Sequence, residues 1–316
     1  RAVCPYTGVA GALARAGNGG GARRRGRKRG GDPGEGGSRT ALQTILLTAR
    51  CEVDVSHERH DTLFGGRLPA PNERTLGALR GVVEETGADI GIATDGDADR
   101  LGIIDDEGKF VHPNEILVLL YYYLVKYRHW HGPAVRNLAT THLLDKVAHA
   151  FGEECYEVPV GFKHISAAID EHNAVIGGES SGGLTVRGHI SGKDGIYAGT
   201  LLVEMLAVTG KKLSELYREI TDQFGECYMV EHDCKFDAEL KASLNQRLMV
   251  DKQLPAFAEH VERVSYLDGC KVYFPGGWIS VRFSGTEPLL RGCWGVPTRS
   301  RARAGRAAVA GGPAGG

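Results

Sequence analysis

The length, composition and charge of the chain exclude several classes of protein. The chain has 316 residues, of which 42% are hydrophobic, enough for roughly two or three domains with their own cores. No apolar run approaches the roughly 18 residues of a membrane-spanning helix, and no secretory-type apolar segment follows the first basic residues. The seven cysteines are widely spaced without a Cys-x-x-Cys pair, which argues against a disulfide framework or a zinc site. We therefore expect a cytoplasmic protein without a membrane partner.

The net charge of −1 conceals an uneven distribution. Residues 1–40 contain nine Lys or Arg and two acidic residues, residues 292–316 contain four Arg and no acidic residue, and residues 41–291 contain 25 basic and 37 acidic residues. Both ends are rich in Gly and show no helical or strand periodicity, so we predict disorder in each. A basic nucleic-acid-binding arm is one interpretation. We favour a second one, frame errors in a GC-rich gene, and expect no nucleic-acid partner.

Between these ends, segments with helical periodicity alternate with short apolar strands. The first helix ends at Gly87, a typical stop residue, and residues 105–108 form a hairpin-type turn. From Tyr228 onward the pattern changes. The order predicts repeated α/β domains with mixed sheets, followed by a smaller α+β domain. The predicted helices are 72–87, 114–127, 143–151, 165–172, 195–209 and 213–224, and the predicted strands are 90–93, 101–104, 156–158, 175–176, 271–274 and 278–283.

Three aspartates alternate directly after the predicted strand 90–93, in the run Asp-Gly-Asp-Ala-Asp-Arg. Alternate residues of an extended segment point the same way, so Asp95, Asp97 and Asp99 converge. Carboxylates this close repel one another unless a cation is present, and oxygen ligands favour Mg²⁺ or Mn²⁺ over zinc. Arg100 follows and can hold a phosphate oxygen. The run therefore predicts a divalent-metal loop with an arginine beside it that can bind phosphate.

Three other interpretations of the aspartate run are available. One is a solvated acidic turn. An EF-hand loop requires Gly at its sixth position and Glu at its twelfth, where this chain has Arg100 and Asp106, so we reject it. A phosphatase of the haloacid dehalogenase type also uses Asp-x-Asp after a strand, usually followed shortly by Thr or Val. Asp99 stands at that place, which makes the phosphatase a weaker rival.

Two further motifs carry groups that suit a sugar phosphate. Residues 177–183, Gly-Gly-Glu-Ser-Ser-Gly-Gly, offer a carboxylate and two hydroxyls to sugar hydroxyls; the alternative is a plain glycine-rich turn. Residues 282–288, Arg-Phe-Ser-Gly-Thr-Glu-Pro, combine an arginine, hydroxyls and backbone N–H groups around a glycine, as a phosphate cradle requires. The alternative there is a polar turn with a capping serine. Arg291 lies just beyond.

Taken together, the three motifs resemble the α-D-phosphohexomutases, a family that includes phosphoglucomutase and phosphomannomutase. The family has four domains around one cleft, and the resemblance covers about residues 41–291. It implies a partial domain II over 41–131 with the metal loop, domain III over 132–226 with the sugar loop, and domain IV over 227–291 with the phosphate loop. Supporting matches are residues 64–69, 160–165 and 192–195.

The resemblance also implies roles for individual residues. Asp95, Asp97 and Asp99 are expected to bind Mg²⁺, and hexose 1,6-bisphosphate is the expected activator. The expected reaction interconverts the 1- and 6-phosphates of glucose or mannose, with a hexose phosphate as the small-molecule partner and no protein partner. The catalytic residues it implies are Arg100, His164 and Lys193, and the substrate-binding residues are Lys163, Glu179, Ser181, Arg282, Ser284, Gly285, Thr286 and Arg291.

One part of the family machinery is missing from the sequence. The family relays phosphate through a phosphoserine in a Thr-Ala-Ser-His-Asn-Pro-type loop of domain I, and no such run occurs here. Ser56 precedes His57 but no Asn-Pro follows, so we interpret it as a serine at a strand end. We therefore expect a truncated chain without a recognisable first strand of domain II, and with little or no mutase activity. A non-catalytic sugar-phosphate-binding protein and a metal-dependent phosphatase are the alternatives.

Overall fold

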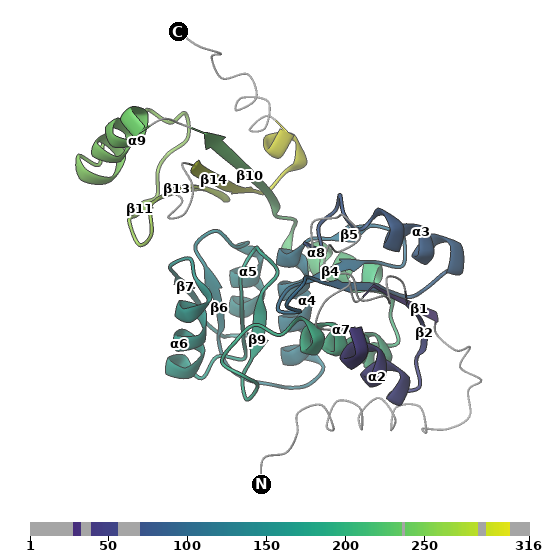
Figure 1. The fold of residues 1–316 in the computed structure, drawn as a ribbon. Coiled ribbons are helices and arrows are strands. Elements are labelled where there is room, and N and C mark those ends of the chain that lie inside the picture. The colour runs from purple at the N-terminus through teal and green to yellow at the C-terminus, as the bar shows by residue number, and fades with distance from the viewer. Residues whose placement is uncertain (1–27, 33–38, 56–69, 236–237, 284–288, 304–316) are drawn as a thin grey trace.

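Three β-sheets organise the chain, and helices lie against each of them (Figure 1). The computed structural model describes residues 28–32, 39–55, 70–235, 238–283 and 289–303. None of the helices in these ranges is long and apolar enough to cross a membrane. The three sheets follow one another along the chain, as repeated α/β units followed by an antiparallel unit, which confirms the predicted fold class.

The first sheet is mixed and has the strand order β2-β1-β3-β4-β5. Strand β1 runs parallel to both of its neighbours, whereas β3, β4 and β5 pair antiparallel. Strands β3 and β4 are buried along their whole length, which explains their uninterrupted apolar sequences. The elements of this part are β1 (Lys28–Asp32), α2 (Arg39–Thr48), β2 (Glu52–Val55), α3 (Gly77–Thr86), β3 (Gly91–Thr94), β4 (Leu101–Ile104) and β5 (Phe110–Val111).

Two predictions about this sheet need correction. The prediction of disorder over residues 1–40 is wrong for Lys28–Asp32, because β1 is an inner strand of the sheet and pairs with both β2 and β3. Its Lys-Arg-Gly-Gly-Asp sequence shows no strand pattern, but sheet pairing uses backbone groups that every such residue carries. The predicted helix 72–87 begins only at Gly77. The Asn72 side chain accepts hydrogen bonds from the Arg74 and Thr75 N–H groups and holds a turn there instead.

The second sheet has the order β7-β6-β8-β9, with only β9 antiparallel. The helix α4 is buried around its whole circumference, including Tyr121, Tyr122 and Tyr123, and it shares one hydrophobic core with α7 and α8. The predicted bounds of α7 and α8 are confirmed. The elements are α4 (Pro113–Lys126), β6 (Ala134–Asn137), α5 (Leu143–Ala150), β7 (Cys155–Val158), α6 (Phe162–His172), β8 (Ile176–Gly178), β9 (Leu184–Val186), α7 (Gly195–Thr209) and α8 (Leu213–Phe224).

The third sheet is antiparallel, has the order β10-β14-β13-β12-β11, and stands apart from the other two in Figure 1. Its last strand corrects another prediction, because residues 292–296 were expected to be disordered but belong to β14. This strand pairs with both β10 and β13, and Cys293 and Trp294 are buried there. The elements are β10 (Tyr228–Lys235), α9 (Ala238–Asn245), a π-helical turn (Gln246–Val250), β11 (Arg263–Ser265), β12 (Cys270–Phe274), β13 (Gly277–Phe283) and β14 (Leu289–Val296).

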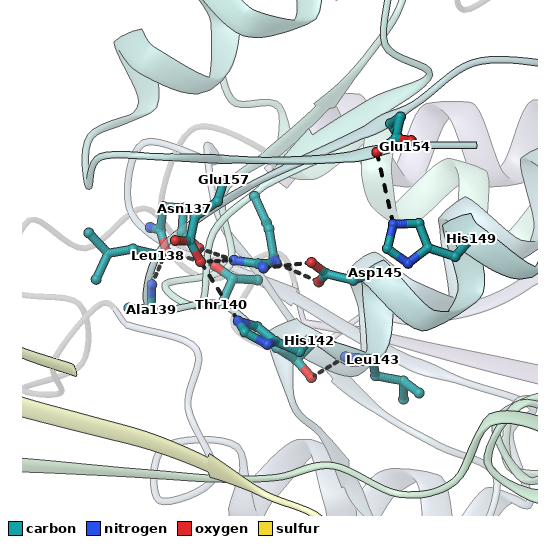
Figure 2. A network of polar contacts seen from close by, with 12 residues as sticks. Asn137, Leu138, Ala139, Thr140, His142, Leu143, Asp145, His149, Glu154 and Glu157 are labelled. Carbon is teal, nitrogen blue, oxygen red and sulfur yellow. Dashed lines mark hydrogen bonds and ion pairs between the residues drawn. The ribbon is translucent and has the colours of Figure 1, made fainter. Parts of the chain in front are cut away.

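A buried cluster of charges joins the second sheet to the third. Arg136 on β6 makes two contacts of 2.6 Å to Asp145 on α5 and a third of 2.6 Å to Glu157 on β7. Lys271 on β12 reaches the same Glu157 Oε2 at 2.6 Å, and the Lys271 side chain is only 2% exposed. Figure 2 shows Asp145 and Glu157 at either side of this network. Because an unpaired buried charge is costly, this cluster ties the third sheet to the second.

His142 completes the charge cluster as a neutral group. Its Nε2 atom lies 3.0 Å from Lys271 Nζ and 3.7 Å from Glu157 Oε2. Its ring stacks on Tyr273 and Trp278 at centroid distances of 5.8 and 5.4 Å. Burial, followed by the nearby positive charge of Arg136, lowers the pKa of His142 from 6.5 to about 4. A neutral Nε2 can accept a hydrogen bond from the Lys271 ammonium, which agrees with this geometry.

The stability of the protein should therefore fall as the pH is lowered from about 6.5 toward 4. In this window His142 binds a proton in the unfolded chain but not in the folded one. The contribution of neutral His142 to the free energy of unfolding is therefore fully present above about pH 6.5 and is lost as the pH falls toward 4. One such proton changes the free energy of unfolding by at most about 1.4 kcal/mol per pH unit. Urea titrations at about pH 7, 6 and 5 should show a shallower pH dependence for His142→Gln. Equal slopes for both proteins would contradict the assignment.

The first turn of α7 packs directly on the loop between β3 and β4. The Gly195 N–H donates a hydrogen bond of 2.9 Å to the Ala98 carbonyl oxygen. A Cβ atom at Gly195 would lie 2.8 Å from the Arg100 carbonyl oxygen and 2.9 Å from that of Ala98. Such distances are too short for real contacts, and backbone atoms cannot move aside as side chains can. Glycine is therefore required where the helix approaches this loop.

We expect Gly195→Ala to lower the free energy of unfolding by about 1–3 kcal/mol, the usual cost of inserting atoms into a packed site. Gly81→Ala is the matched control, because Gly81 lies in α3 and a Cβ atom there would meet no atom within 4 Å. That change should leave stability unaltered or raise it by up to about 1 kcal/mol, since Ala favours helix. Urea unfolding of both variants measures the difference. Similar effects of the two changes would show that the contact is not tight.

Candidate functional site

The three predicted aspartates come together in the loop between β3 and β4. The loop closes through hydrogen bonds from Ala98 N to Asp95 O at 3.1 Å and from Asp95 N to Arg100 O at 3.2 Å, and Ala98 has a left-handed backbone with φ +64°. One carboxylate oxygen from each of Asp95, Asp97 and Asp99 can be chosen so that all three lie within 4.8 Å of one another. Three oxygen donors at this separation fit a divalent cation such as Mg²⁺.

Two basic side chains neutralise part of this acidic loop. Arg100 Nε lies 2.6 Å from Asp95 Oδ2, and the Arg100 N–H donates to Asp95 Oδ1 at 3.1 Å. Lys193, from the segment before α7, places its Nζ 2.5 Å from Asp99 Oδ2. Asp95 is buried, Asp99 is half-buried and Asp97 is exposed. The loop therefore has one carboxylate anchored in the protein, one shared with a lysine and one facing solvent.

The pKa values of Asp95 and Asp99 are shifted in opposite directions. Burial raises the pKa of Asp95, and the hydrogen bonds from Arg100 only partly offset this effect. Burial also acts to raise the pKa of Asp99, but the hydrogen bond from Lys193 and the neighbouring Asp95, Lys193 and Arg100 outweigh it, so that the pKa of Asp99 is lowered. A bound divalent cation would favour the ionised form of both groups.

The predicted sugar loop lies against the metal loop. Gly182 N donates to Glu179 O at 3.1 Å, Glu179 N donates to Gly183 O at 3.0 Å, and the Ser181 hydroxyl donates to Glu179 Oε1 at 2.6 Å. Gly183 forms a β-bridge with Arg100, and a Cβ at Gly183 would collide with the Lys193 side chain. The structure thus brings Glu179, Ser181 and Lys193 to the edge of the aspartate loop.

The structure describes the two strands beside the predicted phosphate loop, up to residue 283 and from residue 289. Ser284, Gly285 and Thr286 lie outside the described residues, but the strands on either side of them are described. Arg282 on β13 and Arg291 on β14 are direct cross-strand partners, so their side chains share one face of the sheet. Arg282 Nε contacts Asp268 Oδ2 at 3.1 Å, and Arg291 Nε lies 3.8 Å from Asp233 Oδ1. Arg282 therefore precedes the predicted loop and Arg291 follows it along the chain, and a guanidinium group can bind a phosphate through two N–H donors.

Lys163 and His164 lie in the first turn of α6, which begins at Phe162, three residues earlier than predicted. Lys163 is exposed, and the His164 N–H donates to Gly161 O at 3.0 Å. The turn before them is connected to the third sheet, because Val160 N donates to Asp268 Oδ2 at 2.9 Å. These two residues are therefore linked to the Arg282 side of the site, whereas Lys193 belongs to the metal-loop side.

Sequence reasoning missed two positions that shape the site. Gly195 was part of a supporting motif without a role, and Asp268 was not singled out at all. The aspartate lies in an Asp-Gly turn between two strands, a common turn signal that says nothing about its long-range partners. Two sequence predictions cannot be compared with the structure, because residues 64–69 and Ser56 lie outside the described part of the chain; β2 ends at Val55, immediately before that serine.

Two models of one protein family match the chain. The model for phosphoglucomutase/phosphomannomutase alpha/beta/alpha domain II matches residues 22–108, and the model for domain III matches residues 112–224. The prediction that residues 1–40 are unlike the family is therefore wrong from residue 22 onward. The domain III match begins ahead of the boundary predicted at residue 132, and the predicted domain boundaries stay predictions.

Known proteins with similar sequences and structures carry related names. Phosphoglucomutase/phosphomannomutase of Thermococcus kodakarensis is 31% identical over 82% of this chain and 55% of its own length. A probable phosphoglucosamine mutase of Methanopyrus kandleri is 32% identical over 86% of this chain and 58% of its own length. The crystal structure of a candidate phosphomannomutase from Thermus thermophilus is 27% identical, with a TM-score of 0.75 over 97% of this chain and 66% of that one.

The chain spans about half the length of the curated relatives that it matches. The two family models nevertheless cover adjoining domains in the family order, and together they extend over more than half of the chain. The aspartate loop lies in the first matched domain and the Glu179 loop in the second, where the structure places them side by side. The chain therefore belongs to the phosphoglucomutase/phosphomannomutase family of α-D-phosphohexomutases.

Proposed function

We propose that this chain supplies the metal, sugar and phosphate sites of an enzyme that interconverts hexose 1-phosphates and hexose 6-phosphates. The observation that carries the proposal is the convergence of Asp95, Asp97 and Asp99 with Lys193 and the Glu179 loop. An acidic, oxygen-only site suits Mg²⁺, while the lysine and the hydroxyl-rich loop suit a phosphorylated sugar. Because the chain spans about half of its curated relatives, the activity of the whole enzyme is part of the proposal.

In this proposal each group of residues has a separate task. Bound Mg²⁺ would neutralise charge on a transferring phosphoryl group. Glu179 and Ser181 would accept and donate hydrogen bonds to sugar hydroxyls, and Lys163 and His164 would contact the substrate from the start of α6. Lys193 and Arg100 would place positive charge beside the reacting phosphate. The remaining phosphate would be held by Arg282, Ser284, Gly285, Thr286 and Arg291.

The phosphate donor decides whether this chain can complete a reaction. The proposed relay needs a phosphoserine, and the 316 residues contain no Thr-Ala-Ser-His-Asn-Pro-type run. A non-catalytic sugar-phosphate-binding protein is therefore the second candidate function, since the binding loops do not depend on that serine. A protein with the same fold but only 14% identity, N-acetylphosphoglucosamine mutase of Aspergillus fumigatus, was crystallised with GlcNAc-6P and magnesium. This complex makes Mg²⁺ and a sugar phosphate sensible first ligands to test.

The sugar preference is also a proposal. The Glu-Ser-Ser-Gly run at 179–182 and the Gly-Phe-Lys-His run at 161–164 look more like those of family members named for glucose or mannose than like the glucosamine branch. This resemblance is the reason to propose a glucose or mannose phosphate. The competing substrate is glucosamine phosphate, because curated relatives of comparable identity are named probable phosphoglucosamine mutases. We propose that the enzyme acts in the cytoplasm, the compartment in which such sugar phosphates occur and in which cysteines stay reduced.

Asp97→Asn should weaken Mg²⁺ binding at least ten-fold, because it removes one anionic ligand from a site of three. Asp97 is the best position to change, since it is exposed, whereas Asp95 also holds Arg100. Calorimetric titration with Mg²⁺ measures the affinity, and Mn²⁺ paramagnetic resonance provides a second readout. Asp222→Asn, an exposed carboxylate on α8, is the matched control and should bind Mg²⁺ as the unchanged chain does. Equal binding by both variants would exclude the aspartate loop as the metal site.

The chain alone should bind glucose 1-phosphate but convert little or none of it to glucose 6-phosphate, even with Mg²⁺ and glucose 1,6-bisphosphate present. A coupled assay of glucose 6-phosphate measures turnover, and calorimetry measures binding in the same samples. Glucosamine 1-phosphate and mannose 1-phosphate, tested in parallel, decide the sugar preference. Turnover in the ordinary enzyme range, about 1–10³ s⁻¹, would overturn the expectation and require a donor from another source. Release of free phosphate that Asp97→Asn abolishes would instead favour the phosphatase.

A further inference from the structure

Asp268 stands at the junction of two predicted substrate-binding segments. Its Oδ2 atom accepts a hydrogen bond of 3.1 Å from Arg282 Nε on β13, next to the phosphate loop. The same atom accepts a hydrogen bond of 2.9 Å from the backbone N–H of Val160, which is 108 residues away along the chain. Val160 directly precedes the turn into α6, whose first residues include Lys163 and His164. One carboxylate oxygen therefore holds a side chain of the third sheet and the backbone of the second unit together.

The turn that carries Asp268 is built tightly against Arg282. Gly269 has a left-handed backbone with φ +82°, and a Cβ atom there would collide with the Val281 carbonyl oxygen and lie 3.1 Å from Arg282 Cα. In the β12–β13 register Cys270 pairs with Val281, so the Asp-Gly turn lies beside Arg282. This close fit fixes where the Asp268 carboxylate can go. The aspartate is therefore placed by backbone packing, and not only by its attraction to the arginine.

The contact with Asp268 leaves the two Nη atoms of the Arg282 guanidinium for other partners. An arginine binds a phosphate best through a fork of two parallel N–H donors. Asp268 engages Nε, so the pair of Nη atoms is not consumed by this contact, and the guanidinium plane is held in one orientation. Arg282 and Asp268 have side-chain exposures of 25% and 28%, so the pair lies at the edge of solvent, within reach of a ligand. An arginine held in this way loses less conformational freedom when it binds an anion.

We propose that Asp268 is a positioning residue that orients Arg282 toward the substrate phosphate. By also binding the Val160 N–H, Asp268 fixes the position of Arg282 relative to the turn formed by residues 160–164. The proposal rests on the proposed function for its ligand, a hexose phosphate. It predicts that Asp268 acts through Arg282 and does not itself contact the ligand. It also predicts that the orientation of the phosphate-binding arginine and the position of the α6 turn change together, because one oxygen atom holds both.

Asp268→Asn tests the proposal, because it keeps the shape of the side chain while removing its charge. Calorimetric titration with glucose 1,6-bisphosphate should show binding about ten-fold weaker than for the unchanged chain. In the Arg282→Gln background the same change should have almost no further effect, since residues that act through one another are not additive. Asp251→Asn is the matched control: its carboxylate lies in the same unit and accepts a hydrogen bond from Gln246 Nε2 at 2.8 Å. This control should bind the bisphosphate normally.

Two results would overturn the proposal: unchanged affinity for Asp268→Asn, or an equal loss of affinity with and without Arg282. A purely structural role would lower stability without the dependence on Arg282, so urea unfolding is measured on each variant. If Asp268→Asn does not fold, Asp268→Glu, which keeps the charge but lengthens the side chain, replaces it in the same cycle.

A chain that binds no hexose phosphate at all would refute the proposed function, and Asp268 is then judged by a measurement that needs no ligand. Amide hydrogen exchange at Val160 should be slow in the unchanged chain and at least ten-fold faster in Asp268→Asn. Exchange at an unchanged rate would show that Asp268 does not hold this turn. The same exchange measurement on Asp251→Asn should show no change at Val160.

Discussion

The close approach of the first turn of α7 to the aspartate loop is the contact on which the site depends. The Gly195 N–H bonds to the Ala98 carbonyl, and no side-chain atom fits between the two backbones. Because this contact places the start of α7, it also brings Lys193, two residues earlier, to Asp99. The β-bridge between Arg100 and Gly183 adds the sugar loop to the same edge. Two backbone contacts of the aspartate loop thus bring together side chains from three loops.

The connection between the second and third sheets has a different physical character. Its buried part consists of Arg136, Glu157 and Lys271, in which Glu157 pairs with both basic side chains. Removal of one of these residues would leave a buried charge without its partner, which is costly. Its partly exposed part is the hydrogen bond from the Val160 N–H to Asp268, whose carboxylate also contacts Arg282 of its own unit. The Asp268–Arg282 pair stabilises the protein less than a buried pair does, because water competes with it. The buried cluster is suited to fix the third sheet, whereas Asp268 and Arg282 lie where a ligand can reach them.

The distribution of charge within the site is consistent with a ligand that carries phosphate. Three carboxylates gather in the β3–β4 loop, where Arg100 and Lys193 neutralise part of their charge. Arg282 and Arg291 are cross-strand partners on the third sheet, and each also contacts a carboxylate. In the function that we propose, a metal ion would bind the carboxylates and a phosphate of the sugar would bind the arginines. The sequence is similar both to a phosphoglucomutase/phosphomannomutase and to probable phosphoglucosamine mutases. This similarity agrees with the proposal of a sugar-phosphate ligand, but it does not identify which sugar is bound.

The sequence by itself determined the features that depend on neighbours along the chain. The bounds of α7 and α8 were predicted from the sequence, and the aspartate loop followed from three alternating residues after a buried strand. Only the tertiary structure showed β1 as an inner strand of a sheet and β14, for which no strand was predicted, because backbone pairing with distant strands stabilises segments whose sequences did not indicate a strand. It alone joined Asp268 to Val160, across 108 residues. Periodicity records which face of an element is buried, whereas contacts between distant segments arise only when the elements pack together.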